Sequence, residues 1–149
     1  MITNLEHMAL SVADIERSVS FYRDLIGLEL IRELECGPET QLGKVAGLPG
    51  CSARIAHLVS GENMLELFEY QDPRGTAMPA DIRQADHGWV HIGFKSSDVR
   101  GDHTRLRDAG VEFISEPVEF RPGVWIVYFR GPDGEVCELR ETPDGETGS

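Results

Sequence analysis

His7-Met8-Ala9-Leu10-Ser11-Val12-Ala13-Asp14 and His91-Ile92-Gly93-Phe94-Lys95-Ser96-Ser97-Asp98 are two versions of one stretch of sequence. Further matches follow in the same order. At an offset of 84, Arg23 and Asp24 match Arg107 and Asp108; at an offset of 72, Glu66, Leu67 and Glu69 match Glu138, Leu139 and Glu141. The chain therefore contains an internal duplication. Each half opens on a strand with a histidine and closes on a strand with a glutamate.

Length and charge limit the classes of protein to consider. A chain of 149 residues can bury a sizeable core as one domain or as two small fused modules. With 26 acidic and 14 basic side chains, the net charge of -12 argues against nucleic-acid binding. We find no apolar run of about 20 residues and no leader-like start, so we expect no membrane segment and a cytoplasmic location. Cys36, Cys51 and Cys137 have no paired spacing, which argues against a disulfide framework or a thiolate zinc site.

Both halves have the pattern of a βαβββ module. In the first half, a strand at 5–12 is followed by a helix capped by Asp14 and ended by Gly27, then by strands at 28–35, 53–59 and 63–70. In the second half, a strand at 89–96 is followed by a helix capped by Asp98 and ended by Gly110, then by strands at 111–118, 124–130 and 135–141.

We therefore predict an α+β fold of two tandem βαβββ modules, with cupped mixed sheets around a site and helices outside. The predicted organisation is a first module at 1–70, a connector at 71–88, a second module at 89–142 and a flexible polar tail at 143–149.

Strand alternation predicts where the four matched side chains point. In the opening strands the apolar residues at every second position suit packing on a helix, which leaves His7 and His91 on the opposite face. The closing strands show the same alternation, with Glu66 and Glu138 facing away from the helices. Two carboxylates buried near each other need a cation or a proton, and two imidazoles are suitable partners for a divalent metal. His7, Glu66, His91 and Glu138 are therefore the predicted metal ligands.

The chain resembles the vicinal oxygen chelate superfamily, which has the glyoxalase, bleomycin-resistance and dioxygenase fold. The resemblance extends from about Leu5 to Glu141, and its motifs stand here at residues 5–12, 21–28, 66–69, 91–94 and 131–139. It implies ligands from the first and last strands of each module, which are the same four residues. The His-Glu-His-Glu set is similar to that of glyoxalase I and of two kinds of epimerase, acting on methylmalonyl-CoA and on cyclitol ketones.

This resemblance implies an enzyme that needs one divalent metal ion, of Zn, Ni, Co, Mn or Fe, and acts on a small molecule. The expected activity is that of an isomerase or epimerase, or of a glyoxalase-type lyase, on a hydroxy-carbonyl or ketone substrate. The metal stabilises an enolate or enediolate while a carboxylate moves the proton. Glu138 is the first candidate for this catalytic base and Glu66 the second. Family members often form homodimers, and the cup closes either within one chain or between two.

Two other functions remain open at this stage. One is an extradiol-type dioxygenase or other group-transfer enzyme, although two histidines and one carboxylate are usual on such an iron. The other is a metal-free protein that binds an antibiotic or another small molecule. Phe68, Trp89 and His57 are candidate substrate-binding residues, because they are predicted on the same sheet faces as the ligands. The substrate itself stays open between a glutathione adduct, an acyl-CoA, and a sugar or cyclitol ketone.

Overall fold

The computed structural model describes residues 1–143 and divides the chain into two compact units, Met1–Ala77 and Met78–Ser149. From residue 144 on, the predicted tail lies outside the described residues. None of the helices in the described part of the chain is long and apolar enough to span a membrane.

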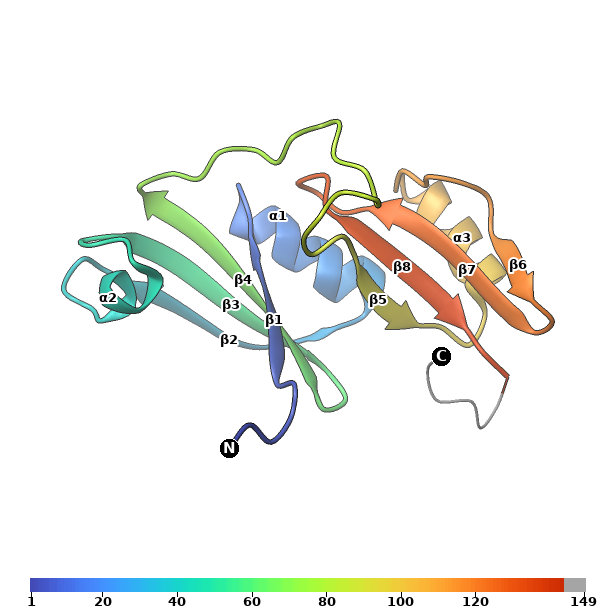
Figure 1. Ribbon diagram of the computed structural model, residues 1–149, viewed down its shortest axis with the longest axis horizontal. Helices are drawn as coiled ribbons and strands as arrows, with labels where there is room; N and C mark the ends of the chain where they lie inside the picture. Colours follow the sequence, from blue (N-terminus) through green and yellow to red (C-terminus); the bar gives the residue numbers. More distant parts are fainter. Residues whose placement is uncertain (144–149) are drawn as a thin grey trace. The chain divides into compact units, whose positions relative to one another are not determined.

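Unit 1 is a four-stranded mixed sheet with a helix on one face (Figure 1). The sheet has the order β1-β4-β3-β2, with β1 parallel to β4 and the other pairs antiparallel. Its elements follow in the order β1 (His7–Ser11), α1 (Ile15–Ser20), a π-helical turn η1 (Phe21–Ile26), β2 (Glu29–Cys36), α2 (Leu42–Ala46), β3 (Ser52–Ser60) and β4 (Asn63–Asp72).

Unit 2 repeats this topology with the order β5-β8-β7-β6, and β5 is parallel to β8. Its elements are β5 (Ile92–Lys95), α3 (Val99–Asp108), β6 (Val118–Arg121), β7 (Val124–Arg130) and β8 (Val136–Glu141). The α3 helix packs on β7 and β8, as α1 packs on β3 and β4. The predicted α+β class and the two tandem βαβββ modules are therefore confirmed.

Both helices start in the predicted way. The carboxylate of Asp14 accepts a hydrogen bond from Arg17 N at 3.0 Å, and that of Asp98 accepts one from Gly101 N at 2.9 Å. A second carboxylate reaches each helix start from the closing strand, because Glu69 accepts from Ile15 N and Glu141 from Val99 N. Carboxylates satisfy the unpaired N–H groups of a helix start and interact favourably with its dipole.

The core of each unit lies between helix and sheet. Leu65 and Leu67 in β4, and Cys137 and Leu139 in β8, are buried at alternate positions. On the helix side of unit 2, His103 is buried and its ring stands edge-on to Phe113, which agrees with a packing role. The alternation that predicted the two faces of the closing strands is therefore confirmed.

Two predicted strands have different bounds in the structure. β5 begins at Ile92 rather than at residue 89, and the carbonyl of Val90 accepts a hydrogen bond from the Gln84 side chain. The segment predicted as a strand at 111–118 forms only an isolated bridge, Phe113 with Phe129, and β6 begins at Val118. Pro117 precedes β6 and has no N–H to donate to a strand ladder. The sequence patterns also did not predict α2 and the π-helical turn.

Candidate metal centre

In unit 1 the sheet places Glu66 between two histidines. Glu66 lies in β4, directly opposite His57 of β3 and Ala9 of β1. The His7 Nε2 atom lies 3.2 Å from Glu66 Oε2, and the His57 Nε2 atom lies 3.0 Å from Glu66 Oε1. Each oxygen of this carboxylate therefore has its own imidazole partner.

Unit 2 contains the matching pair. Glu138 of β8 lies opposite Tyr128 of β7 and Gly93 of β5, and its Oε2 atom lies 3.5 Å from His91 Nε2. Burial, the negative charge of Glu138 and a hydrogen bond to that carboxylate raise the pKa of Tyr128. The Tyr128 ring also lies beside the His91 ring, with 5.0 Å between the centroids.

The second nitrogen of each predicted ligand histidine is hydrogen-bonded to an acceptor. The Nδ1 atom of His7 lies 3.0 Å from a carboxylate oxygen of Glu6, and that of His91 lies 2.9 Å from the amide oxygen of Gln84. A carboxylate and an amide oxygen are acceptors, so each can take a hydrogen bond from Nδ1 in the tautomer that leaves Nε2 without a proton. In that tautomer Nε2, the atom nearest the glutamate, would be the nitrogen for a metal.

Within each pair, the distance between the two donor atoms fits two ligands on one cation. With bonds of about 2.1 Å, two donor atoms on one metal are about 3.0 Å apart at a right angle and about 3.4 Å apart at a tetrahedral angle. The Nε2 to Oε2 distances of 3.2 and 3.5 Å are close to this range. The glutamates are mostly buried, with exposed side-chain fractions of 16% and 13%, whereas the histidines are 39% and 31% exposed.

The structure brings the four predicted ligands together as two pairs, one pair in each unit. Among residues 1–143 there is no group of three or more His, Cys, Asp or Glu side chains that could hold a metal ion.

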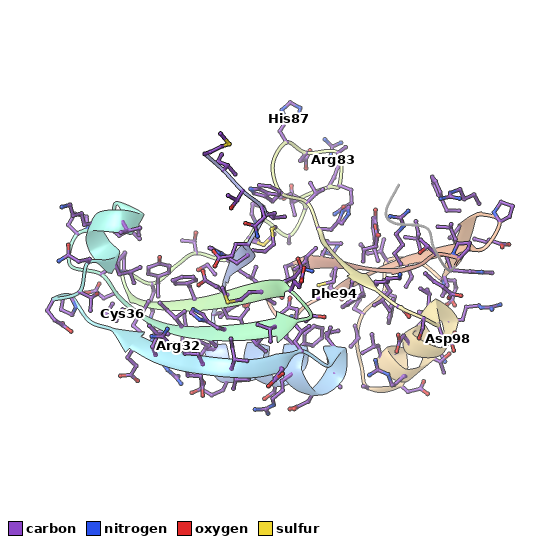
Figure 2. All side chains as sticks on the ribbon, turned by 90° about the horizontal axis from the view of Figure 1, so that it is seen from below. Arg32, Cys36, Arg83, His87, Phe94 and Asp98 are labelled. Carbon is purple, nitrogen blue, oxygen red and sulfur yellow. The ribbon has the colours of Figure 1, made fainter. Side chains whose placement is uncertain are left out.

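The three candidate substrate-binding residues have different surroundings. His57 contacts Glu66, and Phe68 follows two positions along β4 on the same face, with its ring stacked on Tyr70 at 5.9 Å. Trp89 lies outside β5 and is 87% exposed, so its predicted place on a strand face is wrong. The nearby His87 also projects from the loop before β5 (Figure 2).

A separate cavity of about 330 Å³ in unit 1 contains none of the four predicted ligands. It is lined by Ile15, Glu33, Leu34, Glu35, Arg54 and Ile55. Arg54 is paired there with Glu16 of α1 and with Glu69, the carboxylate at the start of that helix. We therefore assign Arg54 a structural role.

The sequence patterns missed four neighbours of the predicted ligands. Glu6 and Gln84 hold the Nδ1 atoms, while Tyr128 and Gly93 flank Glu138. Aligning the two halves strand by strand would have matched Tyr128 with His57 and Gly93 with Ala9. Nothing in the sequence singles out Gln84, because it lies in the connector and reaches His91 only through the path of the loop.

Comparisons with known proteins agree with this architecture. Residues 4–139 match the family model of the Glyoxalase/Bleomycin resistance protein/Dioxygenase superfamily. A 2-epi-5-epi-valiolone epimerase from an Actinomyces species is 32% identical, over 95% of this chain and 80% of the relative. A probable lactoylglutathione lyase from a Synechocystis species is 26% identical, over 93% of this chain and 95% of the relative.

A solved structure shows the same fold. The crystal structure of a glyoxalase family protein from Bacillus cereus superposes with a TM-score of 0.87 at 23% identity, and covers 95% of this chain and 96% of its own. The repeated topology, the matched His–Glu pairs and the family match over residues 4–139 lead to one conclusion. The chain belongs to the Glyoxalase/Bleomycin resistance protein/Dioxygenase superfamily.

Proposed function

We propose that the protein is a divalent-metal-dependent isomerase or epimerase, or a glyoxalase-type lyase, of a small hydroxy-carbonyl or ketone substrate. The observation that carries the proposal is the repeated His–Glu pair, with Nε2 facing the carboxylate and Nδ1 held by an acceptor in both units. The names of two relatives, an epimerase and a probable lyase, support the same class of chemistry.

In this proposal His7, Glu66, His91 and Glu138 hold one divalent ion, of Zn, Ni, Co, Mn or Fe. The ion supplies positive charge for the substrate oxygen on which negative charge develops. Glu138 removes a proton from the carbon next to that carbonyl. Return of the proton to the opposite face of the same carbon inverts that stereocentre and gives an epimer. Return of the proton to the adjacent carbon gives a structural isomer. Glu66 is the second candidate base, and an epimerisation with two bases would use both carboxylates.

Substrate binding in this proposal involves Phe68 and His57, with Trp89 as a third candidate. Phe68 extends the face that carries Glu66 and offers an apolar surface beside the proposed ion.

We also propose that the protein works as a homodimer in the cytoplasm. Mass measurement in solution tests the first of these two points, and cell fractionation tests the second.

The test is incubation in deuterated water with the metal-loaded chain and a panel of substrates. The panel contains a methylglyoxal–glutathione adduct, acyl-CoA esters, and ketose and cyclitol ketones. We expect metal-dependent uptake of deuterium at the carbon next to the carbonyl of one substrate. Glu138→Gln should lower the rate by about 10²- to 10⁴-fold, the usual contribution of a general base. Glu112→Gln is the matched control, because Glu112 is exposed and pairs with Arg130.

Absence of exchange with every substrate, in the presence of saturating Zn, Ni, Co or Mn, would contradict the proposed proton transfer. Oxygen uptake with bound iron and a catechol-like substrate would instead indicate a dioxygenase. A chain that binds a small molecule tightly but takes up no metal would be a binding protein.

A further inference from the structure

Two cationic side chains meet on the sheet of unit 2. Lys95 of β5 is the register partner of Arg140 of β8, as Gly93 is the partner of Glu138 two residues earlier. Because side chains alternate along a strand, Lys95 and Arg140 lie on the same face as Glu138. The third neighbour on this face is Ile126, which is opposite Arg140 on β7. The ladder therefore sets an ammonium and a guanidinium side by side, next to a proposed metal ligand.

Other side chains stand at the equivalent positions of unit 1. Ser11 of β1 pairs with Phe68 of β4, and Ile55 of β3 lies opposite Phe68. The isoleucine is kept in both halves, whereas a hydroxyl and an aromatic ring in unit 1 are replaced by two cations in unit 2. Since the sheet has the same topology with either set of residues, the fold does not require the cations.

The two cations differ in how firmly they are held. Arg140 is half-buried with a buried Nε atom, whereas Lys95 is exposed. Burial of Nε restricts the planar guanidinium to few orientations, while the ammonium of Lys95 is carried on a flexible four-carbon stem. One fixed planar donor group and one adaptable point charge therefore share a small area of the sheet.

The charge of this area is opposite to that of the chain as a whole. The protein has 26 acidic and 14 basic side chains and a net charge of -12. Like charges at facing positions of a sheet repel each other, and an anion bound between them replaces this repulsion by two attractions. A guanidinium donates two parallel hydrogen bonds to a carboxylate or a phosphate, and an ammonium adds a further donor. The pair is therefore suited to a group in which several oxygens share a negative charge.

We propose that Lys95 and Arg140 form a subsite for an anionic group of the substrate, a carboxylate or a phosphate. This inference rests on the proposed function, in which the reacting carbon lies beside Glu138. Positions two apart on a strand are about 7 Å apart, so the anionic group is separated from the reacting carbon by several bonds. Lys95 and Arg140 then determine specificity, because they exclude substrates without a negative charge, such as an uncharged ketose or cyclitol ketone.

The first test measures anion binding by NMR, without substrate and without added metal. The full chain is labelled with ¹⁵N and titrated separately with sodium phosphate and sodium acetate, with sodium chloride at the same ionic strength as reference. We expect saturable shifts of the Lys95 and Arg140 amides and of the Arg140 Nε–H signal. Saturation by phosphate alone identifies a phosphate subsite, and saturation by acetate alone identifies a carboxylate subsite.

Variants of the two cations test their roles separately. Lys95→Met keeps the length of the side chain and should weaken binding of the anion by about tenfold, the usual effect of losing one hydrogen bond to a charged group. Arg140→Lys keeps the charge but loses the planar fork, and should weaken binding by a similar factor. Lys44→Met and Arg105→Lys are matched controls, because Lys44 lies in α2 of unit 1 and Arg105 pairs with Asp102 on α3.

A double variant transfers the residues of unit 1 to unit 2. Lys95→Ser with Arg140→Phe reproduces the Ser11 and Phe68 pair, which packs beside an isoleucine in the same topology. We expect this variant to fold, as thermal melts would show, and to lose the saturable shifts. In a substrate assay, Lys95→Met should raise KM by about tenfold and leave kcat within about threefold, since the contact is the same in the ground state and the transition state.

The outcomes separate this inference from the proposed function. If phosphate or acetate binds at Lys95 and Arg140 but no substrate exchanges deuterium, the anion subsite stands and the proposed proton transfer fails. If neither anion produces saturable shifts at the two residues, or if Lys95→Met binds as tightly as Lys44→Met, the inference is wrong whatever the activity. Deuterium exchange in an uncharged ketone, with KM unchanged by Lys95→Met, would also overturn it.

Discussion

His7 and His91 illustrate how a neighbouring side chain decides which nitrogen of an imidazole is available to a metal. In both rings Nδ1 faces a hydrogen-bond acceptor, a carboxylate oxygen of Glu6 in one unit and the amide oxygen of Gln84 in the other. The two acceptors differ in their distance along the chain from the histidine, because Glu6 is adjacent to His7 whereas Gln84 lies seven residues before His91. Gln84 also donates to the Val90 carbonyl at 3.0 Å, which fixes its amide orientation.

Replacing Gln84 should therefore weaken metal binding without removing a ligand. Gln84→Leu leaves the His91 Nδ1 atom without its acceptor, so the ring no longer prefers the tautomer that presents Nε2. We expect metal affinity to fall by about 10- to 100-fold, as is usual for such outer partners. Competition with a chelating dye measures the affinity, and ¹⁵N NMR of the imidazoles reports the tautomer.

Arg83→Leu is the control for this substitution, because Arg83 is adjacent in the same loop and its guanidinium pairs with Asp86. Equal affinities of the Gln84 and Arg83 variants would contradict the proposed role of the amide.

At the scale of elements, each closing strand directs two glutamates to opposite faces. Glu66 and Glu138 lie on the face away from the helices, while Glu69 and Glu141 accept from the first N–H of the α1 and α3 helices. The three-residue spacing produces this division, because side chains alternate along a strand. One short motif therefore supplies both a candidate ligand and a helix-capping group.

The aspartate caps of these helices should contribute measurably to stability. Asp98→Ala removes the acceptor of Gly101 N and should lower the free energy of unfolding by about 1 kcal/mol, and Asp14→Ala should do the same through Arg17 N. Urea unfolding followed by circular dichroism measures both changes.

Asp98→Asn is the matched variant, since asparagine caps a helix about as well as aspartate. A loss of stability as large in Asp98→Asn as in Asp98→Ala would show that charge, rather than the cap hydrogen bond, provides the stabilisation.

At the scale of the whole molecule, the proposed site needs both halves of the duplication. Metal analysis of the purified chain should give about one ion per chain, because four donors saturate a typical zinc site. His7→Ala and His91→Ala, one in each unit, should each abolish tight binding of that same ion. Retention of half the metal in each variant would instead indicate two independent sites.

Mixing two variants distinguishes closure within one chain from closure between chains. One variant carries His7→Ala with Glu66→Gln, and the other carries His91→Ala with Glu138→Gln. Sites built between chains would be restored in mixed dimers, to about a quarter of the wild-type number after random exchange. Sites built within one chain would not be restored.

Much of this architecture follows from local sequence. The positions of Asp14 and Asp98 predicted the helix starts, and period-two alternation predicted the buried faces of β4 and β8, because capping and amphipathic packing act over a few residues. The bounds of β5 and β6 were wrong. Their ends depend on a side-chain hydrogen bond from Gln84 and on a proline, which disrupt pairing in otherwise apolar segments.

The sequence by itself determined the duplication, the two βαβββ modules and the side of each sheet on which His7, Glu66 and Glu138 lie, whereas His91 precedes β5 rather than lying in it. The tertiary structure alone decided what surrounds them: His57 on one carboxylate, Tyr128 and Gly93 beside the other, and an acceptor on each Nδ1 atom. The physical reason is that a side chain's face is set by its own strand. Its neighbours are set by strand register and loop path, which bring together residues distant in the sequence.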